Sequence, residues 1–271
     1  MPHITINATR LHFTDLGEGP ETIVFSHGLL FSGRMFDAQV AQLQQKYRCI
    51  TYDHRGQGGS AVTPDGYDMD TLTEDAAALI RALDAGPCHF VGLSMGGFVG
   101  LRLALRHPEL LKSLTLLDTS ADPEPTENRG RYRLLNFVAR WFGLRIVVSR
   151  VMPILFGATF LSDPARAPER RKWRDRIVAN DRLGITRAVR GVIERSGVTD
   201  RLGRIDLPVL ILVGDEDVAT VPEKSERMQA RIPGARLVRL TAAGHSAPIE
   251  QPAAVTAEIR AFLRQQSQHA D

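Results

Sequence analysis

A serine stands between two glycines in the segment VGLSMGG, residues 91–97. Gly92 and Gly96 flank Ser94, the run CHFVGL before it has the composition of a strand, and the run after it has helical apolar spacing. A turn from strand directly into helix is strained, and small residues on either side relieve contacts with neighbouring backbone. Such a turn would hold the Ser94 hydroxyl above the carboxyl ends of the strands. The segment predicts a serine nucleophile, and a serine that only caps the helix is the alternative.

A serine hydroxyl needs a base near neutral pH, and the base needs a group that orients it. Two late loops supply candidates: GDEDVATVP follows the apolar run VLILVG, and AGHSAPIEQP follows the run ARLVRL. Of the eight histidines, His245 alone lies after a late strand and between turn residues. We therefore expect His245 at the same sheet edge as Ser94, as the general base; an ordinary loop histidine is the alternative.

The orienting acid has several candidates. Asp215, Glu216 and Asp217 share the loop after VLILVG, and Asp118 ends the strand run SLTLLD at the same edge of the sheet. We favour Asp217, because the loop must turn out of the strand before a carboxylate reaches His245. Asp215 would then make local turn hydrogen bonds, and Asp118 is the main rival. The acid would accept the Nδ1 proton in a hydrogen bond and stabilise the imidazolium.

Attack of a serine on a carbonyl creates an oxyanion that needs hydrogen-bond donors. The N–H of Met95 directly follows the nucleophile and is the first expected donor. The second should come from the loop FSHGLLFSG after the third strand, where Gly28 allows a close approach of the backbone. We nominate the N–H of Leu29. His27 in the same loop is expected to hold the loop in place.

Short apolar runs alternate with amphipathic segments through most of the chain. Strands are expected at residues 3–6, 10–16, 22–26, 48–53, 88–93, 113–118, 208–214 and 235–240, and helices near 36–46, 71–84, 95–107, 222–231 and 252–265. The alternation predicts the α/β class, with a mostly parallel eight-stranded sheet flanked by helices. The two earliest strands have short connections and should be antiparallel.

The alternation stops between residues 121 and 205, where the sequence becomes Arg-rich and helical and is interrupted by prolines. This stretch is too long for a single crossover between strands. We interpret residues 121–205 as an inserted helical cap and residues 1–120 and 206–271 as the core. Helices that simply pack on the sheet edge are the alternative.

The substrate pocket should lie between the cap and the loop that contains Leu29. The expected pocket residues are Leu30, Phe31, Phe137, Trp141, Met152 and Phe156. An apolar pocket with few polar groups suits a neutral ester or lactone. One of the cap arginines could instead hold a substrate carboxylate, although such arginines more commonly solvate a helix face.

Five segments in this order, HGLL, YDHRGQGGS, GLSMGG, GDED and GHSAPIEQP, give the chain a resemblance to a known family. Over nearly its full length the chain resembles the α/β-hydrolase fold family. It looks most like the esterase, enol-lactonase and cofactor-free haloperoxidase group. That likeness rests on YDHRGQGGS and GHSAPIEQP and covers the sheet but not the cap. Arg55, within YDHRGQGGS, is expected to tie its loop with hydrogen bonds.

The resemblance implies hydrolysis of a carboxylic ester or lactone through an acyl-serine intermediate, with water activated by His245 and with no metal or organic cofactor. The sequence agrees, because it contains no His-Glu-x-x-His, Cys-x-x-Cys or Gly-Lys-Ser/Thr phosphate loop. Related dehalogenases and epoxide hydrolases use an aspartate nucleophile, so Ser94 argues against both. Two alternatives stay open: perhydrolase or haloperoxidase-like activity, and a slow-turnover ligand-sensing protein on the same fold.

Composition limits the other classes of function. The 271 residues carry a formal net charge of only +3, which is no evidence for nucleic-acid binding. Cys49 and Cys88 both start expected strands and should be reduced core residues, as in a cytoplasmic protein. We expect neither a secretory signal nor an integral membrane segment, because no apolar run is long enough. The expected partner is a small-molecule ester or lactone, and a homodimer is left open.

Overall fold

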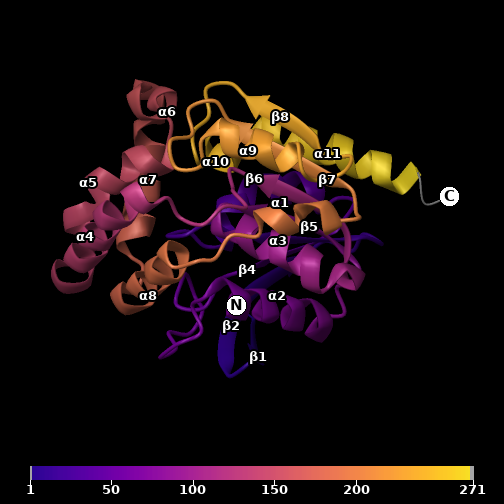
Figure 1. The fold of residues 1–271 in the computed structure, drawn as a ribbon, viewed down its shortest axis with the longest axis horizontal. Coiled ribbons are helices and arrows are strands. Elements are labelled where there is room, and N and C mark those ends of the chain that lie inside the picture. The colour runs from indigo at the N-terminus through magenta and orange to yellow at the C-terminus, as the bar shows by residue number, and fades with distance from the viewer. Residues whose placement is uncertain (1, 269–271) are drawn as a thin grey trace.

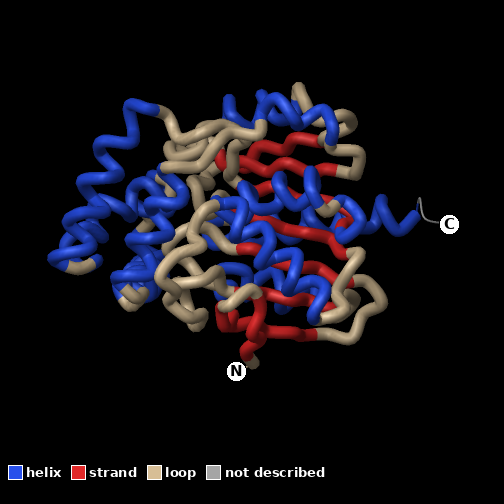
Figure 2. Tube along the Cα trace, turned by 60° about the horizontal axis from the view of Figure 1, so that its bottom comes forward, coloured by secondary structure: helices blue, strands red, loops and turns tan. Residues whose placement is uncertain are grey.

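In a computed structural model that describes residues 2–268, one sheet runs through the molecule with helices on both faces, and a further group of helices stands at one end (Figures 1 and 2). The strands are β1 (His3–Ile6), β2 (Thr9–Leu16), β3 (Thr22–Ser26), β4 (Arg48–Tyr52), β5 (Cys88–Leu93), β6 (Leu111–Leu117), β7 (Val209–Gly214) and β8 (Arg236–Leu240). These eight strands correspond to the eight apolar runs identified in the sequence.

The strand order is β1-β2-β4-β3-β5-β6-β7-β8. β1 pairs antiparallel with β2 and β2 antiparallel with β4, and all later pairs are parallel. The predicted α/β class, the mostly parallel eight-stranded sheet and the antiparallel start are thereby confirmed. The carboxyl ends of β3 and β5 to β8 lie at one edge, so loops that follow these strands meet there.

Residues along each central strand alternate between the two faces of the sheet. In β3, Ile23 and Phe25 belong to one buried apolar cluster, whereas Val24 belongs to the other. The first cluster includes side chains of α1 (Asp37–Leu43) and α11 (Pro252–Gln268), and the second those of α2 (Met69–Ala82), α3 (Met95–Arg106) and α9 (Pro222–Gln229). Because both faces are covered, the central strands β5 and β7 are buried along their whole length.

Helix starts follow local capping chemistry. The side chain of Asp68 accepts a hydrogen bond from the N–H of Thr71 at 2.8 Å and caps α2. Asp181 caps α8 (Arg182–Ile193) in the same way through two backbone N–H groups. Pro222 occupies the first turn of α9, where its missing N–H costs no helical hydrogen bond.

Five α-helices lie between β6 and β7: α4 (Thr126–Phe142), α5 (Leu144–Leu155), α6 (Ala158–Ser162), α7 (Ala167–Val178) and α8. Figure 1 shows them beside the sheet, at the end opposite the C-terminus. They occupy most of residues 121–205, which we call the cap. We propose that the cap is an inserted unit with these boundaries. A short helix that the sequence did not predict, α10 (Ala247–Glu250), follows the loop of His245.

Both cysteines are buried and free, as expected for reduced core residues. Burial raises the pKa of each thiol to about 12, so neither is a reactive thiolate near neutral pH. Among residues 2–268, no helix combines the length and apolar character needed to cross a bilayer.

Arg55 fixes the loop after β4, as the sequence predicted. Its Nε and Nη2 atoms donate to the two oxygens of Asp75 in α2, each at 2.8 Å, and its Nη1 donates to the carbonyl of Asp65. Both side chains of the pair are at most 4% exposed. The pair is therefore desolvated, and either charge alone would be buried without compensation.

We predict that Asp75→Asn lowers the free energy of unfolding by about 3–5 kcal/mol, because it leaves the Arg55 charge buried and unpaired. The double variant Arg55→Met/Asp75→Leu removes both charges and should lose clearly less. Urea unfolding followed by circular dichroism measures both values. A double variant as unstable as Asp75→Asn would contradict the prediction.

Candidate active site

Ser94 lies at the strained turn between β5 and α3. Its backbone has φ 50° and ψ −110°, in the positive-φ region that favours glycine. A Cβ at Gly92 would stand 2.3 Å from the carbonyl oxygen of Gly96, and one at Gly96 would stand 2.0 Å from that of Ser26. Only glycine fits at both places, which explains the Gly-x-Ser-x-Gly spacing. The N-terminus of α3 begins at the next residue and adds its positive partial charge.

His245 and Asp217 form a buried pair on the loops after β8 and β7. The Nδ1 atom of His245 lies 2.9 Å from Asp217 Oδ2. The other oxygen of Asp217 accepts the N–H groups of Ala219 and Thr220, at 2.8 and 2.9 Å. The Thr220 hydroxyl donates to Asp217 Oδ2 at 2.7 Å. These four contacts fix the carboxylate. The contact with Asp217 uses only Nδ1 of the imidazole, so Nε2 takes no part in it.

The electrostatics of the pair favour an ionised acid. Burial alone would lower the pKa of His245, but the Asp217 charge and hydrogen bond outweigh it, so the pKa of His245 is raised above its usual value. Burial would raise the pKa of Asp217, but His245 and the Thr220 contacts hold it below its usual value. Asp217 is therefore a carboxylate near neutral pH, and it stabilises the imidazolium form of His245.

Asp118, the rival acid, is also buried close to this pair. Its Oδ1 accepts the N–H of Gly214 at 2.8 Å, and its Oδ2 accepts that of Ala247 at 3.3 Å. Burial first, and then the neighbouring Asp217 charge, raises the pKa of Asp118 well above its usual value. Asp118 thus ties the end of β7 to the segment after His245, whereas the imidazole contacts Asp217.

The other two acids of the loop point elsewhere. Asp215 pairs with exposed Arg239 at 2.6 Å, rather than making the expected local turn bonds with its side chain. Glu216 accepts the N–H of Thr159 at 2.8 Å and also contacts the Thr159 hydroxyl, which connects the loop to the cap. Among the described residues, no group of three or more His, Cys, Asp and Glu side chains is arranged to hold a metal ion.

The loop after β3 lies against the nucleophile. A Cβ at Gly28 would stand 3.5 Å from Cβ of Ser94, which is van der Waals contact. His27 accepts the N–H of His54 on Nε2 at 2.9 Å; its Nδ1 therefore carries the proton and donates to the Gly28 carbonyl at 2.7 Å. This contact fits the expected structural role of His27. Leu29 lines the same cavity as Ser94, and Met95 is the first residue of α3.

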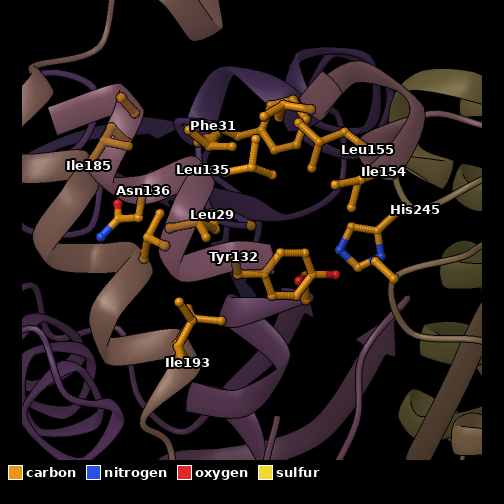
Figure 3. Close-up of a pocket in the computed structure, with 18 of the residues that line it drawn as sticks. Leu29, Phe31, Tyr132, Leu135, Asn136, Ile154, Leu155, Ile185, Ile193 and His245 are labelled. Carbon is orange, nitrogen blue, oxygen red and sulfur yellow. The ribbon is translucent and has the colours of Figure 1, made fainter. Parts of the chain in front are cut away.

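Ser94 and His245 both line one cavity of about 140 Å³ between the core and the cap. Figure 3 shows His245 at one end, with side chains of α4, α5 and α8 around the remainder. The apolar wall consists of Leu29, Leu30, Phe31, Leu93, Phe98, Leu135, Ala139, Leu144, Val147, Val151, Ile154, Leu155, Ile185, Val189, Val192 and Ile193. The structure thus brings the serine and the imidazole to one apolar space.

Of the six residues expected in the pocket, only Leu30 and Phe31 line this cavity. Met152 and Phe156 are buried in the same apolar cluster as Leu30 and Phe31 but do not line the cavity. Phe137 and Trp141 lie on the outer face of α4, where they are 57% and 62% exposed. The sequence supplied apolar candidates within the cap, but it could not show which face of each helix turns inward, because α4 carries apolar side chains on both faces.

Four polar side chains of the cavity, Glu124, Tyr132, Asn136 and Arg195, were missed by sequence reasoning. Figure 3 shows Tyr132, from α4, directed toward His245. Burial and then the Glu124 charge raise the pKa of Tyr132, so its hydroxyl is a neutral donor. Glu124 and Arg195 form a buried ion pair at 2.8 Å in the cavity wall, and Arg195 lies over the Phe98 ring. The cavity wall therefore carries no net charge from this pair.

Glu250 joins the cap to the loop of His245. Its Oε2 accepts the N–H groups of Gly157 and Gly244 at 2.9 and 3.0 Å, and its Oε1 accepts that of Ser246 at 3.0 Å. Gly157 belongs to the cap, and the other two residues flank His245. Glu250 is part of the segment GHSAPIEQP, so its position in the motif was a signal of this role.

Comparison with known proteins identifies the family to which this fold belongs. A family model described as the alpha/beta hydrolase fold matches residues 21–252. "Putative carbamate hydrolase RutD" of Pseudomonas syringae pv. syringae (strain B728a) is 32% identical over 252 residues, which cover 90% of this chain and 94% of that protein.

Solved structures give the same result. An esterase from Thermogutta terrifontis is 32% identical with a TM-score of 0.90, and 98% of each chain is covered. The enol-lactonase from Burkholderia xenovorans LB400 is 29% identical with a TM-score of 0.91, and the match covers 97% of this chain and 100% of that one. Given the family match and these likenesses over nearly the whole length, the chain belongs to the α/β-hydrolase fold family.

Proposed function

We propose that the protein is a serine hydrolase that cleaves a carboxylic ester or lactone. The observation that carries the proposal is the meeting of Ser94, on a strained turn, with the buried His245–Asp217 pair at one apolar cavity. Similarity to an esterase and to an enol-lactonase supports the same class of reaction.

The mechanism assigns a role to each of these groups. His245 takes the hydroxyl proton of Ser94 as the oxygen attacks the substrate carbonyl, and Asp217 stabilises the resulting imidazolium. The N–H groups of Leu29 and Met95 would donate to the oxyanion. His245 then protonates the leaving oxygen, which leaves an acyl-serine. A water molecule, deprotonated by His245, attacks the acyl group and releases the acid.

The cavity favours a small and uncharged acyl group. Its volume of about 140 Å³ resembles that of engineered apolar cavities, of about 150 Å³, that hold benzene. Arg195 is the only arginine in its wall, and the Glu124 carboxylate already neutralises it. A substrate carboxylate would be buried there without a free cation, which is costly. A neutral ester or lactone is therefore favoured over an acidic one.

Other reactions use the same groups. The relative named for carbamate hydrolysis makes a carbamate the second candidate substrate, since its carbonyl can be attacked in the same way. Perhydrolysis would replace water by peroxide at the acyl-serine, and a ligand sensor would bind without appreciable turnover. A cytoplasmic location and a homodimer stay predictions from the sequence.

Loss of the nucleophile or the acid should reduce turnover of p-nitrophenyl butyrate by different amounts. We expect Ser94→Ala to lower kcat about a millionfold and Asp217→Asn about ten-thousandfold. Asp118→Asn should cost much less, because Asp118 contacts backbone N–H groups. A fluorophosphonate probe should label Ser94. Full activity in Asp217→Asn together with none in Asp118→Asn would reverse the assignment of the acid.

The pH profile should report His245. Burial lowers the pKa of His245, but the effect of Asp217 is larger and raises the pKa above 6.5. On acidification, kcat/KM should therefore fall with a midpoint pH above 6.5, because the base becomes protonated. Asp217→Asn removes the raising charge, so NMR titration of the His245 ring should show a lower midpoint in this variant. An unchanged midpoint would show that Asp217 does not control the imidazole.

A panel of esters tests the substrate class. Neutral p-nitrophenyl esters of about four to six acyl carbons should give the highest kcat/KM, and an analogue with a terminal carboxylate should be about a hundredfold slower or worse. Glu124→Gln frees the Arg195 charge and should raise the relative rate for the acidic ester. A higher kcat/KM for a carbamate than for the esters would replace the ester proposal. A preference for peroxide over water at the acyl-serine would also replace it. Tight binding with negligible turnover would support a sensor.

A further inference from the structure

The outer face of the cap carries a strip of exposed apolar side chains. Leu134, Phe137 and Trp141 recur on one face of α4, and Phe142 and Ile146 continue the strip across the turn into α5. Each of the five is more than half exposed. None of the five lines the cavity that contains Ser94. The helices that carry them, α4 and α5, stand at the end of the molecule opposite the C-terminus (Figure 1). We call these five residues the cap strip.

The surroundings of the cap strip are strongly basic. Residues 130–157 contain five arginines and no lysine or acidic residue, which leaves the remainder of the chain with a formal net charge of −2. The arginines are Arg131, Arg133, Arg140, Arg145 and Arg150. None of them forms an ion pair with an acidic side chain among the described residues. The segment that contains the cap strip thus has a formal net charge of +5, whereas the remainder of the chain is slightly negative.

A basic hollow adjoins the cap strip between α4 and α8. It measures about 740 Å³, and its wall includes Arg133, Arg140, Arg187 and Arg190 together with Phe137 and Trp141. The guanidinium of Arg140 lies 5.5 Å from the Trp141 ring. The one acidic side chain in this wall is Glu194. Several cations therefore face a space large enough for an anionic headgroup, directly beside aromatic side chains.

These features point to one kind of partner. An apolar strip with aromatic rings, bordered by arginines, has the composition of helices that lie in the interface of an anionic lipid layer. A second copy of the chain is disfavoured, because a twofold contact places the same patch against itself and would bring the unpaired arginines together. We propose that the cap docks on an anionic lipid surface through the cap strip. This docking does not depend on the chemistry at Ser94.

Trp141 provides a direct probe of this contact. The chain has only two tryptophans, and Trp173 is 5% exposed whereas Trp141 is 62% exposed. Titration with phosphatidylglycerol/phosphatidylcholine vesicles should shift the emission to shorter wavelength, and brominated acyl chains should quench it. Pure phosphatidylcholine should give little change. Added salt should weaken the binding, because it screens the arginines.

Two variants separate the apolar and the charged contributions and leave both tryptophans in place. Phe142→Ser/Ile146→Ser should abolish quenching by brominated chains. Arg140→Gln/Arg145→Gln should weaken vesicle affinity about twenty-five-fold, at about five-fold per arginine. Leu16→Ser/Arg264→Gln is the matched control, because both residues are exposed and lie outside the cap. Circular dichroism verifies folding in each case.

The possible outcomes decide between partners. Binding to anionic vesicles that both cap variants weaken and the control does not supports the proposal. Failure of the unmodified protein to bind such vesicles overturns it. An emission shift that grows with protein concentration without lipid, with a dimer in sedimentation that Phe142→Ser/Ile146→Ser disperses, would show that a second copy covers the strip instead.

Discussion

Ser94 adopts a left-handed backbone conformation because β5 and α3 approach each other, and the end of β3, too closely for side chains at positions 92 and 96. This close packing holds the hydroxyl above the strand ends and starts α3 at the next residue. The loop after β3 also packs against this turn: a Cβ at Gly28 would stand 2.6 Å from a methyl group of Leu93 and 3.5 Å from Cβ of Ser94. The position of the nucleophile is thus set by backbone packing in the sheet, and the other groups of the site are arranged around it.

Three buried carboxyl groups surround the loop of His245 and differ in their partners. Asp217 contacts the imidazole, Asp118 holds the end of β7 and the segment after His245, and Glu250 holds both sides of His245 and the cap. Burial first, and then the neighbouring Asp217 charge, raises the pKa of Asp118. Although burial would raise the pKa of Asp217, the His245 charge and the hydrogen bonds from His245 and Thr220 hold it below its usual value. Two of these acids therefore position backbone, and one orients the base.

The cap has different chemistry on its two sides. Its inner side closes an apolar cavity in which the Glu124–Arg195 pair is neutral, so the space suits an uncharged acyl group. Its outer side is apolar and basic, which suits an anionic surface. The α5–α6 corner connects to the core through Glu216 and Glu250, on the loops that carry Asp217 and His245. Contacts with the cap and the geometry of the pair are thus linked through backbone hydrogen bonds.

The sequence by itself determined the sheet, its parallel part and the elements on which Ser94, Asp217 and His245 stand, because apolar periodicity and glycine spacing are local properties. It left the acid open between Asp217 and Asp118, since both follow core strands at one edge. Only the tertiary structure decided that the imidazole contacts Asp217, because this depends on how two loops pack against each other. The tertiary structure also decided which face of α4 lines the cavity, because the helix rotates to fit its neighbours. Tyr132 and Leu135 turn inward, whereas Phe137 and Trp141 turn outward.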